Sequence, residues 1–480
     1  MSTHTGAVGK RRFSASLIVL LTLAAGVHLF CWSPYAVDVD PSNFRQALFD
    51  YDISRDRPHP PGYPLYVGMG RAAAVLVGEA YAYQVVNLAL LLCTTVLVYR
   101  VTRSFAGRGP GLLAAALTCV HPVLLAATIP AECYITDALL AMTLAWLFTL
   151  RKTASPAWLF AALLLVTAAL SMTRITSAVL LLPIAVWTLT TSRAARPIDT
   201  ALGFAALAVG VIAAGYTTTI ILAGGAETYR QATARVMGAA FRSSSVFGGA
   251  ELATHLRMAA RLSVWLMLIG LPVAFALLGR GLSNRRLPRP SLDLLRSDFA
   301  VATILIAGPF LAMYSLIYFL KPTYLTVIVC FANIAVAVAL APWIEKLRAD
   351  LPTGRLAVTA AAVIAAAFLA IPGDRLPDPL YRLTARYFHD RHDAMHDLDR
   401  LLDEADQPRR LLVIRQLPED VNLYQALTVT DHSALAKQLP DGIYIFDGQW
   451  HGPIEPGQVG QDSSFYRSIA YLDGNTINYR

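Results

Sequence analysis

Two stretches of one loop carry the residues of this sequence that are best suited to chemistry. The first contains Asp38 and Asp40, which directly follow the first long apolar run. A carboxylate at the end of an apolar helix can be partly desolvated, which would raise the pKa of Asp40 toward the range of a general base. The second stretch reads His59-Pro60-Pro61-Gly62-Tyr63-Pro64, and its prolines favour a rigid corner. We therefore predict Asp40, with Asp38 as the second choice, to be catalytic.

Other ionisable side chains lie at the ends of later apolar runs, on the same predicted side as this loop. The candidates for substrate binding are His59, Glu132, Arg174, Arg242, Lys321 and Tyr324. The family resemblance described below implies a phosphate leaving group, which the cations would stabilise as its negative charge develops. Glu132 and His59 could then orient that phosphate or bind a divalent metal.

Several of these candidates also have a structural interpretation. Arg174 could satisfy a very tight hairpin, Lys321 could extend from a helix end toward the membrane surface, and Arg242 could be solvated. A histidine in a proline-rich turn is often a hydrogen-bonding prop. The sequence therefore leaves metal binding open and predicts no cofactor with certainty.

The elements that must position these residues are apolar helices. The chain of 480 residues is 56% hydrophobic and 15% charged, with a mean hydropathy of +0.50, whereas soluble domains are about a quarter charged. We predict an α-helical polytopic membrane protein of about eleven transmembrane helices. The expected spans are 13–33, 81–99, 110–129, 133–150, 157–172, 175–191, 200–223, 259–279, 299–320, 323–341 and 355–372.

Charges in the short loops predict the orientation. With the N-terminus in the cytoplasm, the basic loops fall on the cytoplasmic side, as the positive-inside rule requires. An odd number of spans then places the C-terminus outside the cytoplasm. The residues behind this assignment are Arg100, Arg103, Arg108, Arg151, Lys152, Arg193, Arg196, Arg280, Arg285, Arg286, Arg289, Lys346 and Arg348. The net charge of +8 thus reflects topology and not a nucleic-acid partner.

The chain divides into two predicted domains. Residues 1–372 form the transmembrane domain, which includes a first outer loop at 34–80. Within that loop, the short apolar run from Leu65 to Gly78 predicts a re-entrant or interfacial helix. Residues 373–480 are polar with short β-prone runs, which predicts a small extracytoplasmic α+β domain.

The histidines that begin this tail are spaced to share one side of a helix. They are His389, His392 and His396, and Asp and Arg residues are interleaved with them. Such alternating charges favour a solvated amphipathic face over a metal site.

Three motifs of the sequence resemble the GT-C membrane glycosyltransferases, in particular the protein O-mannosyltransferase and aminoarabinose-transferase branch and bacterial relatives with a His-Pro-Pro-Gly-Tyr-Pro loop. The run Asp40-x-x-Asn43-Phe44 is similar to the family's acidic position after the first span. The run Ala131-Glu132-Cys133-Tyr134 resembles the acidic residue that opens a later span. The run Lys321-Pro322-Thr323-Tyr324-Leu325 resembles a Lys-Pro-Gly-Tyr element, with threonine in place of glycine. The resemblance covers the first four spans best.

The resemblance implies a GT-C-like fold, two interfacial helices in the first outer loop, and hexosyl or pentosyl transfer. The sugar would pass with inversion from a polyprenyl-phosphate carrier to a hydroxyl of a lipid, glycan or protein acceptor. Asp40 would take the acceptor's proton, at the extracytoplasmic face of what the composition suggests is a bacterial inner membrane. An apolar groove opening sideways near the first loop would then hold the carrier's tail.

Two alternatives remain open from the sequence. A polytopic transporter or lipid-linked-sugar flippase would have a similar number of spans, but its essential residues should lie deeper in the bilayer. A structural subunit with a degenerate site would not respond to Asp40→Asn.

Overall fold

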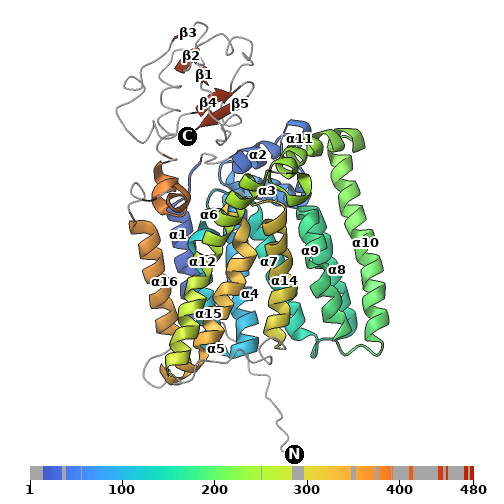
Figure 1. Ribbon diagram of the computed structural model, residues 1–480, viewed down its shortest axis with the longest axis vertical. Coiled ribbons are helices and arrows are strands. Elements are labelled where there is room, and N and C mark those ends of the chain that lie inside the picture. The colour runs from blue at the N-terminus through green and yellow to red at the C-terminus, as the bar shows by residue number, and fades with distance from the viewer. Residues whose placement is uncertain are drawn as a thin grey trace, which may run out of the picture.

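The computed structural model is a bundle of long helices with shorter helices lying across one end (Figure 1). We call this end, where α2 (Val39–Ala47) and α3 (Pro64–Val77) lie, the first-loop end. The structure describes residues 15–34, 39–55, 57–249, 251–283, 297–319, 321–347, 353–371, 376, 378–390 and 392, and five strands between 410 and 479. The predicted candidates Asp38 and His396 lie outside the described residues.

The long helices follow the predicted spans. They are α1 (Ala15–Phe30), α4 (Ala82–Ala106), α5 (Arg108–Cys119), α6 (Pro122–Thr128), α7 (Tyr134–Leu150), α8 (Pro156–Thr173), α9 (Ile175–Thr190), α10 (Pro197–Leu222), α12 (Leu252–Ser283), α14 (Asp298–Leu316), α15 (Thr326–Leu347) and α16 (Thr353–Ala370). Each of the eleven predicted spans coincides with one of these helices, or with α5 and α6 together.

Among the described residues, six helices are long and apolar enough to cross a membrane, namely α4, α8, α10, α12, α14 and α15 with the turn before it. The pair α5 and α6, bent by 52° at its break, would form a seventh span if it crosses as one unit. The helices α1, α7, α9 and α16 are apolar but shorter. The protein is therefore a multi-pass membrane protein, and the count of eleven stays a prediction.

The basic turns lie at the end of the bundle opposite the first-loop end. Figure 1 shows this for the turns between α4 and α5, α7 and α8, and α9 and α10. These turns carry Arg103, Arg108, Arg151 and Arg193. The predicted separation of basic loops from the first loop is thus visible in the fold.

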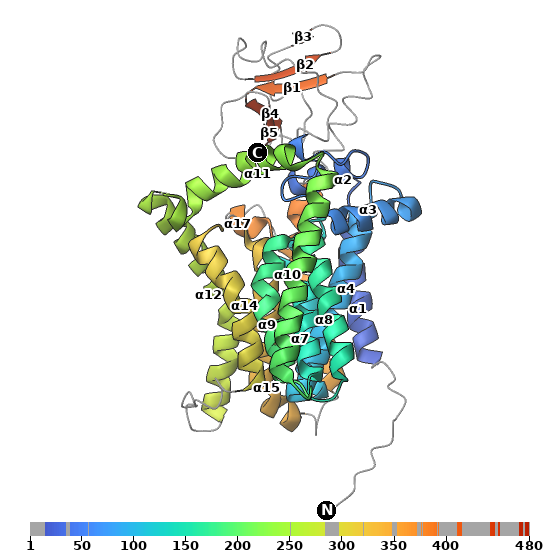
Figure 2. The same ribbon diagram turned by 90° about the vertical axis from the view of Figure 1, so that its right-hand side faces the viewer.

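The apolar segment after the proline-rich turn forms α3. Figure 2 shows α3 running crosswise at the first-loop end, which agrees with an interfacial helix and not with a re-entrant one. Its tip is fully exposed, with Val75 at 86% and Leu76 at 84% exposure. The segment between α10 and α12 contains α11 (Ala226–Ser244), which also lies across this end, and η2 (Val246–Gly248).

The tail contains α17 (Asp378–Tyr381) and one five-stranded sheet in the order β3-β2-β1-β4-β5. Its strands are β1 (Arg410–Ile414), β2 (Gly442–Phe446), β3 (Trp450–His451), β4 (Ala470–Asp473) and β5 (Thr476–Tyr479). The β1–β4 pair is parallel and the other pairs are antiparallel. The segments between the strands lie outside the described residues, so the α+β domain stays a prediction.

The start of the tail packs against the first helix, which corrects the interpretation of its histidines. The His389 ring lies 5.1 Å from the Phe30 ring at the end of α1, and His392 Nδ1 lies 3.0 Å from Ser33 Oγ. The neighbouring Tyr387 and Phe388 are buried. Arg386 is 57% exposed and pairs with Asp390 at 2.8 Å, as the predicted charged face requires. The prediction of a solvated face fails only for His389 and His392, because apolar neighbours in the tail bring these two residues onto the bundle.

Candidate active site

Asp40 lies in the first turn of α2. Its carboxylate contacts Lys321, which lies 281 residues later in the sequence. Lys321 Nζ donates to Asp40 Oδ2 at 2.8 Å and to Glu132 Oε1 at 2.5 Å. The side chains of Asp40 and Lys321 are 19% and 20% exposed, whereas Glu132 is 2% exposed. One ammonium group is thus shared between an accessible carboxylate and a buried one. We call these three residues the shared-lysine cluster.

The backbone turn at Ala131 and Glu132 sets the position of the Glu132 side chain. The preceding Ala131 has a φ of +68°, a left-handed conformation that a residue with a side chain adopts at a cost of about 1–3 kcal/mol. Hydrogen bonds offset that cost, because Tyr66 Oη donates to the Ala131 carbonyl at 3.0 Å and Asn87 Nδ2 donates to the Glu132 carbonyl at 2.8 Å. This turn brings the Glu132 carboxylate to Lys321.

Lys321 is positioned by the proline that follows it. A residue before proline is disfavoured from the helical region, and Lys321 is extended with φ −139° and ψ 152°. The next four residues form η3 (Pro322–Leu325), which leads directly into α15. Lys321 therefore stands between two helices at the first-loop end, where its ammonium group reaches Asp40.

Tyr134, the first residue of α7, joins the cluster although the sequence analysis did not select it. Its hydroxyl donates to Asp40 Oδ2 at 3.1 Å, and its ring centre lies 5.4 Å from Lys321 Nζ and 5.1 Å from Arg174 Cζ. The predicted Tyr324 packs edge-on against this ring, with centroids 4.7 Å apart. The signal for Tyr134 was its place two residues after Glu132 in the family-like run.

The proline-rich turn brings a histidine to the other oxygen of Asp40. His59 Nδ1 lies 3.7 Å from Asp40 Oδ1, and His59 Nε2 lies 3.1 Å from Tyr63 Oη. Gly62 closes the turn by donating its N–H to the His59 carbonyl at 3.1 Å. Its φ is +111°, and a Cβ there would lie 2.5 Å from the Tyr51 hydroxyl oxygen. Only glycine meets both conditions.

Arg174 forms a separate ion pair beside the cluster. It lies between α8 and α9, and its Nη1 donates to Asp137 Oδ2 at 2.5 Å. Its side chain is 14% exposed and that of Asp137 is 2% exposed. We call this ion pair the buried pair. Arg242, in contrast, is exposed in the last turn of α11, and none of the described contacts joins it to the cluster.

The electrostatics of Asp40 correct one prediction. Burial by itself would raise the pKa of this carboxyl group, but the charges of Lys321 and His59 and the hydrogen bonds from Lys321 and Tyr134 lower it well below its ordinary value. The predicted rise in pKa is therefore wrong. The reason is a lysine 281 residues away, which the local sequence does not reveal.

The residues present do not fit a divalent metal. Within the described ranges, no group of three or more His, Cys, Asp or Glu side chains is arranged to hold an ion. The ammonium group of Lys321 lies between Asp40 and Glu132, where a bridging cation would have to bind. We derive no step through a metal.

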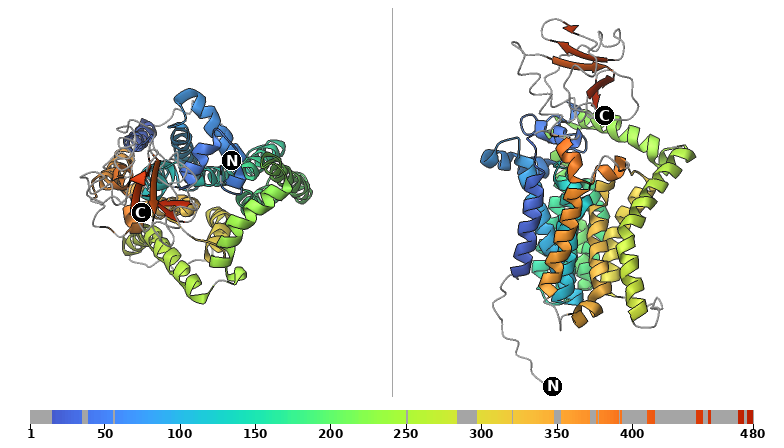
Figure 3. Two further views of the ribbon diagram at one scale, coloured as in Figure 1. Left: turned by 90° about the horizontal axis from the view of Figure 1, so that it is seen from above. Right: turned by 90° about the vertical axis from the view of Figure 1, so that its left-hand side faces the viewer.

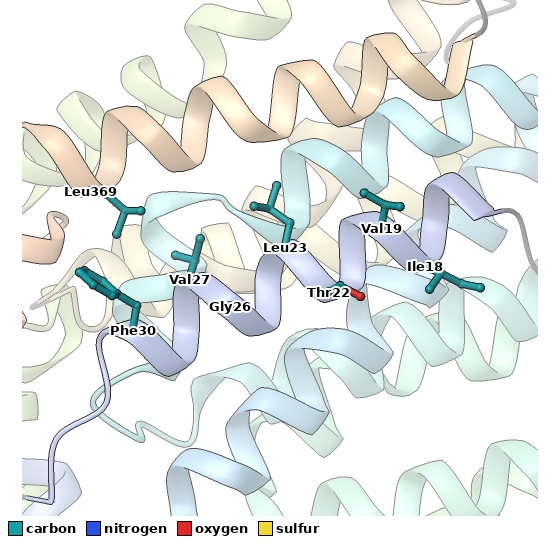
Figure 4. Close-up of a pocket in the computed structure, with 8 residues that line it drawn as sticks. All are labelled: Ile18, Val19, Thr22, Leu23, Gly26, Val27, Phe30 and Leu369. Atoms are coloured by element: carbon teal, nitrogen blue, oxygen red, sulfur yellow. The ribbon is translucent and has the colours of Figure 1, made fainter.

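An apolar groove of about 610 Å³ opens between α1 and α16, away from the shared-lysine cluster. These two helices pack side by side, although α1 is the first and α16 the last of the described long helices in the sequence (Figure 3). Figure 4 shows Leu23 and Val27 of α1 pointing toward α16, whose Leu369 points back at them. The groove reaches Phe30, the last residue of α1 before the first loop. An apolar groove thus lies at the side of the bundle, and its use by a carrier's tail stays a prediction.

Comparison with known proteins gave structural neighbours only. No family model and no curated protein sequence matches the chain. The fold is similar to the Archaeoglobus fulgidus oligosaccharyltransferase crystallised with a tethered acceptor peptide (13% identity, TM-score 0.39, 78% of this chain and 55% of that chain). It is also similar to ArnT from Cupriavidus metallidurans (15% identity, TM-score 0.41, 80% and 72%).

The chain spans about half the length of the oligosaccharyltransferase. The likeness concerns the fold, and the activity of this chain must be argued from its own residues.

Proposed function

We propose that this protein is an inverting glycosyltransferase that moves a sugar from a polyprenyl-phosphate carrier to an acceptor hydroxyl at the extracytoplasmic membrane face. The observation that carries the proposal is the shared-lysine cluster. Four separate segments bring Asp40, Lys321, Glu132 and His59 together at the first-loop end. Asp40 and Lys321 remain partly exposed, so a substrate could reach a carboxylate and an ammonium group at once.

The cluster suits displacement at an anomeric carbon. The acceptor oxygen would form a bond to that carbon while the bond from the carbon to the phosphate oxygen breaks, and its electron pair would stay on the phosphate. Asp40 would take the proton of the acceptor hydroxyl. Lys321 would stabilise the charge that develops on the departing phosphate.

The two cations have different parts in this proposal. Lys321 is partly exposed and shared between two carboxylates, so a phosphate oxygen can compete for one of its N–H groups. Arg174 is already paired one-to-one with Asp137 and lies against the Tyr134 ring. We therefore assign phosphate contact to Lys321, and we assign to Arg174 the support of Tyr134.

The groove between α1 and α16 is our candidate for the carrier's tail. Its lining is apolar apart from Thr22, and several of its side chains face outward from the bundle, including Ile18 at 53% and Phe30 at 63% exposure. A polyprenyl chain could enter such a groove from the bilayer, with its phosphate toward the first-loop end. Its acceptor would be a lipid, glycan or protein outside the cytoplasm of a bacterial inner membrane.

The placement of the cluster favours an enzyme over a transporter. A transport path needs ionisable groups along the membrane-spanning part of the helices. Asp40 is instead on the crosswise helix α2, and Glu132 and Lys321 precede α7 and η3. This arrangement supports chemistry at one membrane face.

The test is release of labelled sugar by the purified protein in lipid bilayers, with a panel of radiolabelled polyprenyl-phosphate hexoses and pentoses. Asp40→Asn should lower the release by about 100- to 1,000-fold while donor binding persists. Asp50→Asn is the matched control, because Asp50 is an exposed carboxylate of the same loop that pairs with Arg57. Equal turnover by wild type and Asp40→Asn would refute Asp40 as the base. No turnover from any donor would refute the proposed function.

A further inference from the structure

We infer that His59 is the second proton carrier of the site: Asp40 Oδ1 takes the acceptor's proton and passes it to Nδ1 of His59. This inference rests on the proposed function and adds a catalytic residue to it. It also changes the role of His59, which the sequence analysis placed among the phosphate-binding candidates.

The two oxygens of Asp40 are not equivalent. Oδ2 accepts hydrogen bonds from Lys321 at 2.8 Å and from Tyr134 at 3.1 Å. Oδ1 faces the imidazole of His59, whose Nδ1 lies 3.7 Å away. A proton arriving at Asp40 would therefore go to Oδ1, since Oδ2 already has two donors.

Asp40 is poorly suited to keep that proton. The neighbouring charges hold the pKa of its carboxyl group well below its ordinary value, whereas an imidazole has an ordinary pKa of about 6.5. Transfer from the carboxyl group to a neutral imidazole is therefore downhill. The relay leaves Asp40 ionised and ready for the next turnover. Nδ1 of His59 is buried, so its proton passes to water only once the product has left the site.

The surroundings of His59 suit this role. Its Nε2 lies 3.1 Å from Tyr63 Oη, which can accept the Nε2–H and leave the Nδ1 lone pair facing Asp40. The Phe44 ring packs edge-on against the imidazole, with centroids 5.5 Å apart. Among the described contacts, the charged and titratable groups that face the pair include Lys321 and Tyr134 at Asp40, and Tyr63 at His59.

The distance between the two groups is compatible with a relay that forms on substrate binding. At 3.7 Å, Nδ1 and Oδ1 are beyond hydrogen-bonding distance. Catalytic hydrogen bonds are often long in the free enzyme and shorten in the substrate complex. The shape of the His59–Tyr63 turn is fixed by Gly62, so we expect α2 to make most of that small approach.

The relay has a signature in the pH dependence of sugar release. His59 must be neutral to accept a proton, so the wild-type rate should fall as decreasing pH protonates the imidazole. In His59→Gln this acid limb should move below about pH 5, because only a carboxylate then has to stay ionised. At pH 8, kcat of this variant should be about 10- to 100-fold lower, with the KM for the donor unchanged.

A second variant keeps the test decisive if His59→Gln folds poorly. Tyr63→Phe retains the ring that packs on Phe44 and removes only the hydroxyl beside Nε2. We expect it to lower kcat by about threefold to tenfold without changing the donor KM. Thermal unfolding in detergent would confirm that both variants are folded.

Several results would overturn the relay. A wild-type acid limb below pH 5, or a limb that lies at the same pH in His59→Gln as in the wild type, would show that the imidazole does not carry the proton. A raised donor KM with unchanged kcat would instead make His59 a donor-binding residue. Each of these would leave the proposed transferase intact, whereas the absence of sugar release from every donor would remove the transferase and the relay together.

Discussion

The first-loop end holds two groups of opposite charges that differ in how they are neutralised. In the shared-lysine cluster, one ammonium group serves two carboxylates, and Asp40 and Lys321 are each about one-fifth exposed. In the buried pair, one guanidinium serves one carboxylate, and Asp137 is 2% exposed. Tyr134 touches both groups, through its hydroxyl on Asp40 and its ring beside Arg174.

The difference indicates which group can react. A shared, accessible cation can change partners when a phosphate arrives, and its carboxylate can then meet an acceptor. A buried one-to-one pair has no such freedom, because breaking it would leave an uncompensated charge in an apolar setting. We therefore expect substitutions of Asp40 to act on turnover and substitutions in the buried pair to act on stability. Removal of Lys321 should act on both, because it also leaves the buried Glu132 carboxylate without this cation.

Of the variants that test this comparison, Lys321→Met should have the largest effect, which is on the rate of sugar release. It removes the cation that two carboxylates share and that we assign to the phosphate, so sugar release should fall by about 100- to 1,000-fold. Lys321→Arg keeps the charge and should retain more activity, though with altered geometry. Wild-type turnover by Lys321→Met in the sugar-release assay would break the assignment.

Arg174→Gln should have the next largest effect, on stability. It leaves Asp137 buried without its partner, which costs about 3–5 kcal/mol. The double variant Arg174→Gln with Asp137→Asn removes both charges and should recover most of that loss. Unfolding by SDS in mixed micelles would measure the free energies. A stable but inactive Arg174→Gln would place Arg174 with the reacting groups. It would contradict the assignment of the buried pair to stability.

The smallest effect should come from the groove between α1 and α16. A Cβ on Gly26 meets nothing within 4 Å, so Gly26→Leu adds an apolar side chain to the groove without a clash. We expect the donor KM to rise by about threefold to tenfold for long polyprenyl carriers and not for short ones. Gly203→Leu on α10 is the matched control, because its Cβ position is also open. An unchanged KM for the long carrier would move the tail elsewhere.

Much of the fold follows from local properties of the sequence. A run of apolar residues must satisfy its backbone hydrogen bonds internally, so each predicted span coincides with helix in the structure. The proline-rich motif likewise gives its turn, since Pro64 begins α3 and Gly62 takes a conformation that other residues avoid. The short helix in the first outer loop could also be anticipated, because the apolar run from Leu65 to Gly78 is bounded locally by Pro64 and Gly78.

The candidate site could be predicted only as a set of residue types on one side of the membrane. The sequence selected Asp40, Glu132 and Lys321 separately, but it gave no sign that one ammonium group would join both carboxylates. It placed Arg174 with the phosphate-binding cations, and the structure pairs it with Asp137. Helix periodicity does not tell which helix ends meet.

What the sequence determined by itself, then, is the set of apolar helices, the grouping of the basic turns and the rigid His59–Tyr63 turn, because each depends on neighbours along the chain. The tertiary structure alone decided that Lys321 lowers the pKa of Asp40, that Tyr134 belongs to the site and that His389 packs on α1. Charges and hydrogen bonds act over a few ångströms. The segments that supply them here are up to 281 residues apart, so only the folded chain sets their effect.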